Sequence, residues 1–337
     1  MALENNSIQL GHGGGGRLTQ QLLQNLVLPL LPPKDGVLHD AARLVAPSHE
    51  LAFTTDSYVV QPLVFPGGDI GRLAVIGSVN DLCMAGARPL ALSLGLILEE
   101  GLQISILERV LQSIAEACRQ CGVSVITGDT KVVERGKGDG LFINTSGIGV
   151  VEHSLRIDPR ELQPGDAVLV SGDLGRHGTA ILAARQSLGL RTDLESDLAS
   201  LQKPVQALVE EGLQLHCLRD LTRGGLVSAM DELASASGLS LLLEEAAIPL
   251  HPTVRGACEL LGLDPLAMAN EGRMVVICPG HEAERALALL QVFQSDAAIV
   301  GRVVERSQQR YPVALRSALG VLRPLALSSG EQLPRIC

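Results

Sequence analysis

The stretch ISILERVLQSIAEACRQCGVSVITGDT, residues 104–130, decides the fold class. Its first part, 104–121, has the apolar spacing of an amphipathic helix, with one face formed by Ile106, Val110, Ile114 and Ala117. Its second part, 123–127, has the pattern of a strand, which is expected to end in Gly128-Asp129-Thr130. The preceding run, 89–98, is nearly continuous in apolar residues, as in a buried strand. A strand, a helix and a second strand in this order predict an α/β architecture.

The same alternation continues on both sides of this stretch. Toward the N-terminus the sequence predicts a helix over 18–31, a strand over 50–55 and a helix over most of 69–86. Toward the C-terminus, strands are expected over 141–151, 167–171, 239–244, 273–278 and 297–304. Helices are expected to begin at 178 and to cover 203–213 and 225–236.

Length and one proline-rich step predict two domains. At roughly 150 residues per domain, the 337 residues suggest two. The segment DPRELQPGD, 158–166, interrupts the alternation and is the expected boundary. From about residue 323 the periodicity fades, which predicts a mobile tail. We therefore expect an N-terminal domain over 1–157, a C-terminal α/β domain over 158–322 and a tail over 323–337.

Composition excludes several classes of protein. Lys and Arg number 27 and Asp and Glu 37, so the formal net charge is −10, which disfavours a nucleic-acid binder. Four Phe, two Tyr and no Trp leave little for base stacking. No apolar stretch reaches the ~18–20 residues of a membrane span. The start, MALENNSIQL, lacks a secretion-signal pattern, and seven cysteines are an odd number, so we expect reduced thiols and a cytoplasmic protein.

Two glycine-rich segments are candidates for phosphate binding. The run GHGGGG at 11–16 precedes a helix, where backbone N–H groups and the helix dipole favour an anion. A flexible linker is the alternative interpretation. The segment SGDLGRHG at 171–178 lies between a predicted strand and a predicted helix, and its alternative is a tight turn.

Five aspartates lie beside glycines or at the expected ends of elements: Asp56, Asp69, Asp81, Asp129 and Asp220. Carboxylates that converge on one cleft would hold Mg²⁺, and Mg²⁺ would neutralise a triphosphate. Taken singly, each aspartate fits a helix cap or a turn former better. The sequence leaves both interpretations open.

The cysteines differ in what they predict. Cys118 and Cys121 form a C-x-x-C at the C-terminal end of a helix, without the second pair that zinc would need, so core packing is expected. Cys337 is the last residue of the expected tail. A thiol on a tether can carry a covalent group between sites, and residues 320–337 could extend on the order of 60 Å at ~3.3 Å per residue. An incidental terminal cysteine is the alternative.

Taken together and in order, these motifs resemble the ATP-binding superfamily of aminoimidazole ribonucleotide synthetase, selenophosphate synthetase and thiamine-monophosphate kinase. Within it, the match is to the hydrogenase maturation factors of the HypE family. The resemblance spans the chain through GHGGGG (11–16), FTTDSYVV (53–60), PGGDIGRLA (66–74), GSVNDLCMAGARP (77–89), TGDTKVV (127–133), SGDLGRHG (171–178), RDLTRGGL (219–226), NEGR (270–273) and PRIC (334–337). Selenophosphate synthetase fits less well, because it carries a reactive Cys or selenocysteine near its N-terminus and no Cys precedes Cys83 here.

The resemblance implies a two-domain α/β (α+β) fold like that of aminoimidazole ribonucleotide synthetase, in which the N-terminal domains of a homodimer form a β-barrel. The implied cofactors are ATP and Mg²⁺. The implied ATP-binding residues are Gly13, Gly14, Gly15, Gly16, Asn80, Asp129 and Gly172. The implied metal ligands are Asp56, Asp69, Asp81, Asp129 and Asp220, and the implied catalytic residues are Cys337, Lys131 and Glu271.

The implied activity is that of an ATP-dependent carbamoyl dehydratase, a lyase that forms ADP and phosphate. An S-carbamoyl group on Cys337 becomes a thiocyanate, which supplies the cyanide ligands of nickel–iron hydrogenase. The implied partners are a HypF-like carbamoyltransferase that loads Cys337 and HypC/HypD-like proteins that receive cyanide. Glu271 is the candidate general base, and Lys131 would position the carbamoyl oxygen or stabilise charge. Without the motif match, a helix cap and a surface ion pair would be favoured instead.

Two other functions stay open. A small-molecule kinase of the same superfamily would transfer phosphoryl to a free metabolite and would not need the tail. A non-catalytic assembly protein would hold metal through Cys118, Cys121 and Cys337 without using nucleotide.

Overall fold

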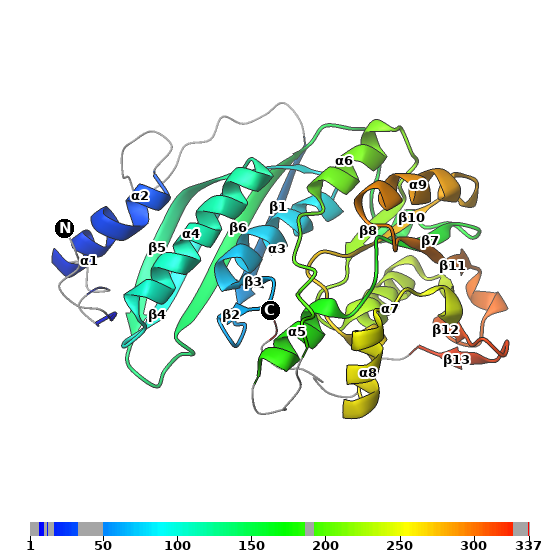
Figure 1. Cartoon of the computed structure of the whole chain (residues 1–337). Coiled ribbons are helices and arrows are strands. Elements are labelled where there is room, and N and C mark those ends of the chain that lie inside the picture. Colours follow the sequence, from blue (N-terminus) through cyan, green and yellow to red (C-terminus); the bar gives the residue numbers. More distant parts are fainter. Residues whose placement is uncertain are drawn as a thin grey trace. The chain divides into compact units, whose positions relative to one another are not determined.

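The computed structural model describes residues 7–9, 12, 17–32, 50–185, 192–325 and 336. The chain divides into two compact units, which Figure 1 draws in sequence colours. The first unit contains the chain up to Leu82 together with Ala87–Glu152, and the second contains Cys83–Gly86 together with His153–Ile336. Each unit is described by itself.

The first unit is built on a four-stranded sheet with the order β1-β6-β4-β5. The strands are β1 (Glu50–Tyr58), β4 (Arg88–Glu99), β5 (Ser124–Val133) and β6 (Leu141–Val151). Strands β4 and β5 pair in parallel, whereas β6 pairs antiparallel with both β1 and β4. A parallel pair needs a crossover connection, and helix α4 (Ile104–Cys121) supplies it. The predicted strand–helix–strand unit is therefore confirmed.

Two helices, α3 (Ile70–Met84) and α4, cover one face of this sheet (Figure 1). Val110, Ile114 and Ala117 of the predicted stripe are buried and Ile106 is half-buried, and Gly122 ends the helix in the left-handed region at φ 67°. Toward the N-terminus, α1 (Arg17–Leu22), the π-helical turn η2 (Leu23–Val27) and α2 (Leu28–Leu30) form the predicted helical segment. A short hairpin of β2 (Val64–Phe65) and β3 (Gly68–Asp69) precedes α3.

The second unit is built on a seven-stranded sheet with the order β13-β12-β9-β11-β7-β10-β8. Its strands are β7 (Ala167–Val170), β8 (Cys217–Asp220), β9 (Ser240–Glu244), β10 (Met274–Cys278), β11 (Ala298–Val304), β12 (Val313–Arg316) and β13 (Leu322–Pro324). All neighbours pair antiparallel except β12 and β9. The α-helices are α5 (Arg176–Ala184), α6 (Gln202–Glu210), α7 (Gly225–Ser237), α8 (Pro252–Leu261) and α9 (Ala283–Phe293). Short 3-10 turns lie at Pro159–Glu161, Glu245–Ala247, Pro265–Ala267, Gly280–Glu282 and Arg306–Gln308.

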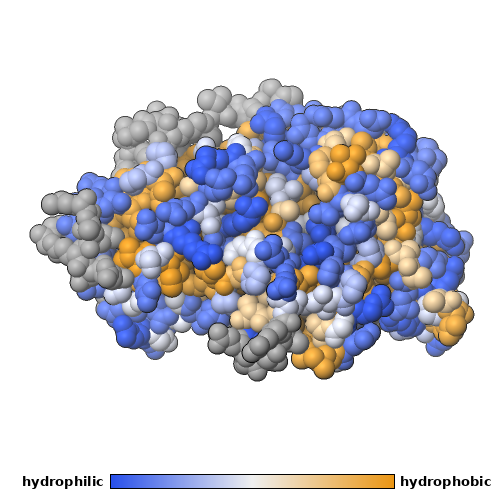
Figure 2. All heavy atoms as spheres, viewed as in Figure 1, coloured by the Kyte–Doolittle hydropathy of each residue, from blue (hydrophilic) through white to orange (hydrophobic). Residues whose placement is uncertain are grey.

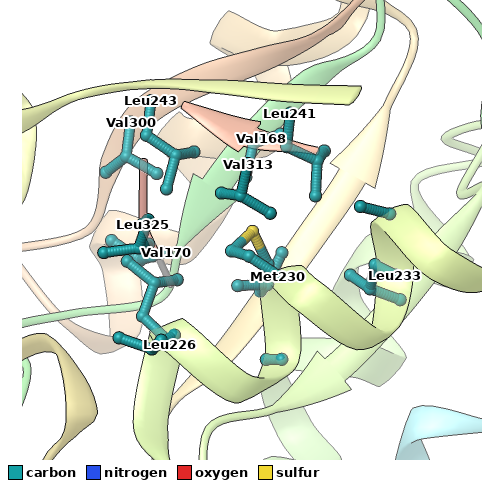
Figure 3. Close-up of a cluster of buried hydrophobic side chains, with 14 of the residues drawn as sticks. Val168, Val170, Leu226, Met230, Leu233, Leu241, Leu243, Val300, Val313 and Leu325 are labelled. Atoms are coloured by element: carbon teal, nitrogen blue, oxygen red, sulfur yellow. The ribbon is translucent and has the colours of Figure 1, made fainter. Parts of the chain in front are cut away.

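The core of the second unit lies between α7 and this sheet. Figure 3 shows Met230 of α7 among apolar side chains from several strands, including Val168 of β7 and Leu241 of β9. All three residues are fully buried. Burying a side chain of this size contributes about 1.5–3 kcal/mol. This packing fixes the strands whose ends carry the motif turns.

Two strands run further than the sequence predicts. Strand β1 continues to Tyr58 and β5 continues to Val133, so Asp56 and Asp129 lie within strands rather than after their ends. Strand β5 is extended because its ladder with β4 continues to Glu99 opposite Val133. The gain of these ladder hydrogen bonds outweighs the weak strand propensity of the Gly-Asp-Thr segment.

The predicted start of the tail, residue 323, lies within a strand of the second unit. Strand β13 pairs with β12, Leu325 is buried, and the isolated position Ile336 is buried as well. Residues 326–335 and Cys337 lie outside the described part of the chain. Among the described residues, none of the helices has both the length and the apolar character that crossing a membrane requires.

Candidate functional site

Asp69 caps one helix and contacts another. It directly precedes α3, and its Oδ1 accepts hydrogen bonds from the backbone N–H groups of Gly71 (2.9 Å) and Arg72 (3.0 Å). Its Oδ2 accepts a hydrogen bond from the hydroxyl of Ser113 in α4. A carboxylate at this position satisfies open N–H groups and interacts favourably with the helix dipole. The structure therefore gives Asp69 the capping role that the sequence left open.

Asn80 and Asp81 lie on α3, and Asp81 contacts β1. The Oδ2 of Asp81 accepts a hydrogen bond from the hydroxyl of Thr54 at 2.7 Å, and Asn80 is buried. Asp56, further along β1, accepts a hydrogen bond from the N–H of Ser57 at 2.8 Å. Helix α3 and strand β1 thus present three of the predicted polar residues within the first unit.

Asp129 and Lys131 form an exposed pair on β5. Two residues apart on one strand, their side chains point to the same face, and the Lys131 Nζ lies 3.2 Å from Asp129 Oδ2. The side chain of Asp129 is 69% exposed and that of Lys131 is 66% exposed. The pair therefore contributes at most about 1 kcal/mol to stability. The Asp129 Oδ1 also accepts the backbone N–H of Thr130 at 2.9 Å, so Oδ2 is the oxygen that has only the weak Lys131 contact as a competitor for a cation.

A cavity of about 220 Å³ lies beside this pair in the first unit. Its walls come from β5, from Leu94 and Leu96 of β4 and from the N-terminal helical segment. Asp129 lies on its wall together with the neighbouring Gly128 and Thr130. Leu94 and Leu96 alternate with Gly95 and Ile97 along β4, and Asp129 pairs with Gly95, so the Asp129 side chain points to the opposite face of the sheet from the apolar wall of this cavity.

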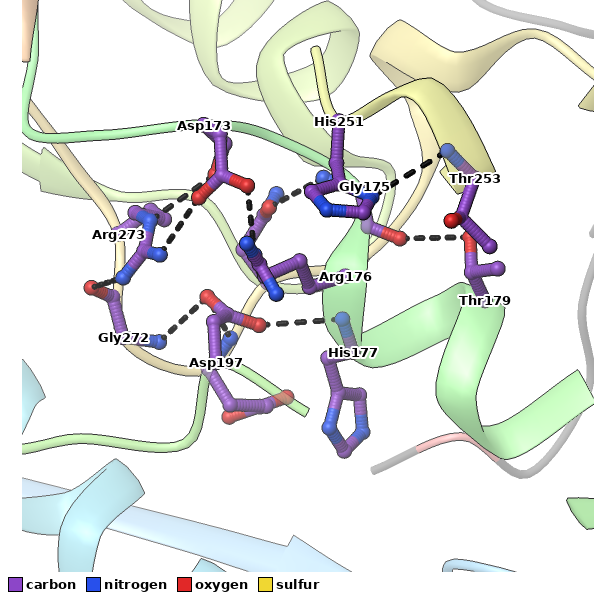
Figure 4. A network of polar contacts seen from close by, with 12 residues as sticks. Asp173, Gly175, Arg176, His177, Thr179, Asp197, His251, Thr253, Gly272 and Arg273 are labelled. Carbon is purple, nitrogen blue, oxygen red and sulfur yellow. Dashed lines mark hydrogen bonds and ion pairs between the residues drawn. The ribbon is translucent and has the colours of Figure 1, made fainter. Parts of the chain in front are cut away.

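In the second unit, the 171–178 turn is held by a buried ion pair. Asp173 binds Arg273 through Oδ1 at 2.7 Å and Arg176 through Oδ2 at 2.5 Å (Figure 4). Burial alone would raise the pKa of Asp173, but hydrogen bonds from Arg273 and then Arg176 lower it below its usual range. A Cβ on Gly172 would lie 2.7 Å from Arg273 Nε, so glycine at this position lets the guanidinium approach the turn.

Asp197 joins three backbone segments and was not predicted. Figure 4 shows its carboxylate between His177 and Gly272. It accepts hydrogen bonds from the N–H groups of His177 (3.1 Å), Glu271 (3.2 Å) and Gly272 (3.0 Å). A Cβ on Gly272 would lie 2.1 Å from the backbone oxygen of Asp197, so this close approach requires glycine. The glycine in the NEGR motif was the only sequence signal for such a contact.

The turn that carries Glu271 is fixed on its other side by Asn270. The side-chain oxygen of Asn270 accepts from Gly175 N–H at 2.6 Å, and its amide donates to the carbonyls of Leu221 (3.0 Å) and Met268 (3.1 Å). Glu271 itself is 3% exposed. Asp220, at the end of β8, is buried opposite Met274 of β10. Gly172, Asp220 and Glu271 thus belong to one rigid set of turns in the second unit.

The ring of His177 connects this set to the end of the chain. Its Nε2 lies 2.6 Å from the carbonyl oxygen of Ile336, and its Nδ1 lies 2.8 Å from Ser196 Oγ. Burial lowers the pKa of His177, opposed by the hydrogen bond to Ile336 and by the charge of Asp197. His177 lies within the SGDLGRHG motif, but the motif itself predicts no role for this side chain.

Several predicted residues lie outside the described part of the chain. Gly13, Gly14, Gly15, Gly16 and Cys337 are among them. The other candidates divide between the two units: Asp56, Asp69, Asn80, Asp81, Asp129 and Lys131 in the first, and Gly172, Asp220 and Glu271 in the second. Within the described ranges, no group of three or more His, Cys, Asp and Glu side chains is arranged to hold a metal ion.

Cys118 and Cys121 are packed into the core. Both are buried, and burial raises the pKa of Cys118 to about 12. A thiol with so high a pKa is a poor nucleophile and a poor metal ligand at neutral pH. The core interpretation of this C-x-x-C is confirmed.

Comparisons with known proteins cover both units. The N-terminal domain of AIR synthase related proteins matches residues 38–151, and the C-terminal domain of the same proteins matches residues 163–313. The carbamoyl dehydratase HypE of Rhodobacter capsulatus is 46% identical over 342 residues, which is 100% of both chains.

Solved structures give the same result. A hydrogenase maturation protein HypE in complex with ATP is 47% identical, has a TM-score of 0.93 and covers 97% of this chain and 99% of its own. A structure described as a HypE–HypF complex matches at 41% identity with a TM-score of 0.78, over 81% of this chain and 89% of its own. Full-length similarity at this level, with both domain families in order, shows that the chain belongs to the HypE family of AIR synthase related proteins.

Proposed function

We propose that this chain is an ATP-dependent carbamoyl dehydratase acting on its own C-terminal residue. The observation that carries the proposal is the 46% identity, over the whole length of both chains, to a carbamoyl dehydratase HypE. The carrier in this proposal is Cys337 of the PRIC segment, 334–337. ATP as co-substrate is supported by the similar HypE structure that contains it.

The reaction converts Cys337 S–C(=O)–NH₂ into S–C≡N. The carbamoyl oxygen is a poor leaving group, and ATP, when bound, supplies the phosphoryl group that turns it into phosphate. The nitrogen loses two protons, the C–O bond breaks, and a carbon–nitrogen triple bond forms. The sulfur stays bonded to carbon throughout. The products are the thiocyanate, ADP and phosphate, with the carbamoyl oxygen retained in the phosphate.

Glu271 is our candidate for the base that takes the nitrogen protons. Support comes from its position: a carboxylate that is 3% exposed, on a turn held by Asp197 and Asn270. A base held rigidly in a water-poor site loses little energy to reorganisation. Lys131 is our candidate for positioning the carbamoyl oxygen or stabilising charge on it, since its ammonium group is exposed and has a single weak partner, Asp129.

Mg²⁺ fits the donor chemistry of the aspartates. Carboxylate oxygens are the ligands that Mg²⁺ prefers, and it needs only one or two of them beside phosphate oxygens and water. The Asp129 side chain is 69% exposed, although its Oδ1 accepts hydrogen bonds from the Thr130 N–H and the Lys131 ammonium, whereas Asp69 is buried and accepts hydrogen bonds through both of its oxygens. We therefore place Asp129 first among the proposed ligands, before Asp56, Asp81, Asp220 and Asp69. The proposed nucleotide contacts are Gly13 to Gly16, Asn80 and Gly172.

A homodimer is supported by exposed apolar side chains on one face of the first sheet. Leu51 and Phe53 of β1 and Ile97 of β4 are 49%, 71% and 41% exposed, on the face that carries Asp129 and Lys131 rather than the face under α3 and α4. The view in Figure 2 is predominantly hydrophilic, with scattered hydrophobic areas. Large apolar side chains grouped on one sheet face favour packing against a second sheet. We propose that a second copy of the chain supplies it, closing the β-barrel across the dimer.

The proposed partners follow from the chemistry of the carrier. A HypF-like carbamoyltransferase loads Cys337, which is supported by the similarity to the solved HypE–HypF complex. HypC/HypD-like proteins receive the cyanide for the nickel–iron centre. We place these steps in the cytoplasm.

The test uses the full-length protein carrying the carbamoyl group on Cys337. Addition of MgATP is expected to lower the intact mass by one water, with the change localised to the C-terminal peptide. Cys337→Ala is the matched control, because it keeps the nucleotide site and cannot carry the group. An unchanged mass, together with phosphoryl transfer to an added metabolite, would favour the small-molecule kinase instead.

A further inference from the structure

We propose that His177 is a positioning residue that seats the penultimate residue of the chain, Ile336, in the second unit. This inference rests on the proposed function for its consequence, namely that the seat presents Cys337 to the turn of Glu271. The seat itself is a contact within the second unit.

The contact joins two residues far apart in the sequence. His177 Nε2 and the Ile336 carbonyl oxygen are 2.6 Å apart, within hydrogen-bond range. His177 is fully buried and Ile336 is 5% exposed. The buried Ile336 side chain and the hydrogen-bonded Ile336 carbonyl together define a specific seat. Leaving the carbonyl or the His177 N–H without a hydrogen-bond partner in this buried place would cost free energy.

The hydrogen-bond pattern fixes the tautomer of the ring. A carbonyl oxygen can only accept, so Nε2 carries the proton and donates it to Ile336. Nδ1 of the neutral ring then accepts from the Ser196 hydroxyl. The Ser196 oxygen in turn accepts the N–H of Leu198 at 3.1 Å. Each donor in this series of hydrogen bonds has one acceptor. The ring of His177 is therefore held in the orientation that binds the Ile336 carbonyl.

Asp197 connects the seat to the proposed base. Its carboxylate accepts the backbone N–H of His177 at 3.1 Å and that of Glu271 at 3.2 Å. His177, which holds Ile336, and Glu271, the proposed base for the carbamoyl nitrogen, are therefore both fixed by the carboxylate of Asp197. Cys337 follows Ile336 directly, so the reacting group is on the residue next to the one that is seated. We infer that this is the productive position of the tail.

The experiment measures the seat without using the reaction. Trypsin can cut after Arg335, but a buried Ile336 protects that bond, and cleavage is read as loss of the Ile-Cys dipeptide from the intact mass. In uncarbamoylated full-length protein, His177→Leu is expected to speed this cleavage about 3- to 10-fold, the effect of losing one hydrogen bond. His177→Gln keeps an N–H donor and should restore most of the protection.

A matched control separates the seat from general destabilisation. His251→Leu removes another histidine of the second unit, whose Nδ1 accepts the Thr253 N–H at the start of α8, whereas the ring that binds the described Ile336 carbonyl is that of His177. It should leave the Arg335 cleavage rate unchanged. If His177→Leu unfolds at the wild-type temperature and also cleaves at the wild-type rate, the seat is refuted.

A second readout tests the productive role. In carbamoylated protein, His177→Leu should lower the dehydration rate at saturating ATP by the same factor of about 3 to 10 while the KM for ATP stays unchanged. A rate equal to or above that of the wild type would overturn the productive position. If the wild type itself shows no dehydration, the proposed function fails, and the cleavage assay still decides whether the seat exists.

Discussion

Replacing Asp197 by alanine should destabilise the second unit strongly, although this residue belongs to no motif. Its carboxylate accepts three backbone N–H groups, from His177, Glu271 and Gly272, at 3.0–3.2 Å. It is 7% exposed, so water cannot readily replace it. A hydrogen bond to a charged group contributes about 1.5–3 kcal/mol, and three bonds to one carboxylate are not additive. We therefore expect a loss of about 3–5 kcal/mol.

The assay is urea unfolding followed by far-UV circular dichroism, comparing wild type, Asp197→Ala and two controls. Asp197→Asn keeps one acceptor oxygen and should lie between the wild type and the alanine variant. Asp193→Ala removes an exposed aspartate from the same segment and should change stability by less than about 0.5 kcal/mol. If Asp197→Ala lies within about 1 kcal/mol of the wild type, its three hydrogen bonds do not hold these turns together, and the structural basis for fixing Glu271 is wrong.

Three further changes test other parts of the site. Gly272→Ala places a Cβ 2.1 Å from the backbone oxygen of Asp197 and should reduce both the stability of the protein and its dehydration rate. The control is Gly256→Ala, which lies in the interior of α8 with open space around it. In thermal unfolding this control should be neutral or stabilising by up to about 1 kcal/mol. Asp173→Ala leaves Arg273 buried without its carboxylate and should cost about 3–5 kcal/mol at pH 7. Because the pKa of Asp173 is lowered in the folded protein, its contribution is complete above the usual aspartate pKa and is lost as pH falls through the lowered value, so the stability difference measured by urea unfolding should shrink in acid. Glu271→Gln should slow dehydration about 10²- to 10⁴-fold in the intact-mass assay, with nucleotide affinity retained. If this variant dehydrates at the wild-type rate, Glu271 is not the base.

Much of the fold could be predicted because its signals are local. The apolar stripe of α4 and the alternation around it depend on residues a few positions apart, and both are confirmed. The length of β5 could not be predicted in this way. Its Gly-Asp-Thr segment has turn chemistry, and only the ladder with β4 keeps it extended. Asp129 is therefore a mid-strand residue rather than a residue of a strand-end turn.

The site shows the same division. Glu271 and Gly172 could be named as candidates because they lie in recognisable motifs, and their roles stay predictions. Asp197 was missed because its partners are backbone N–H groups in two distant segments, which leave no pattern around it. The contact between His177 and Ile336 was missed for a related reason, since it joins positions 159 residues apart. Such contacts form only when the strands and helices have packed.

The most direct test of the account follows the carbamoyl oxygen. Protein carrying an S-carbamoyl group labelled with ¹⁸O on Cys337 is incubated with MgATP in unlabelled water, and the inorganic phosphate released is analysed by mass spectrometry. The account predicts one labelled oxygen in the phosphate for each thiocyanate formed. Label that appears in water instead, or thiocyanate formed with unlabelled phosphate, would contradict phosphoryl transfer to the carbamoyl oxygen.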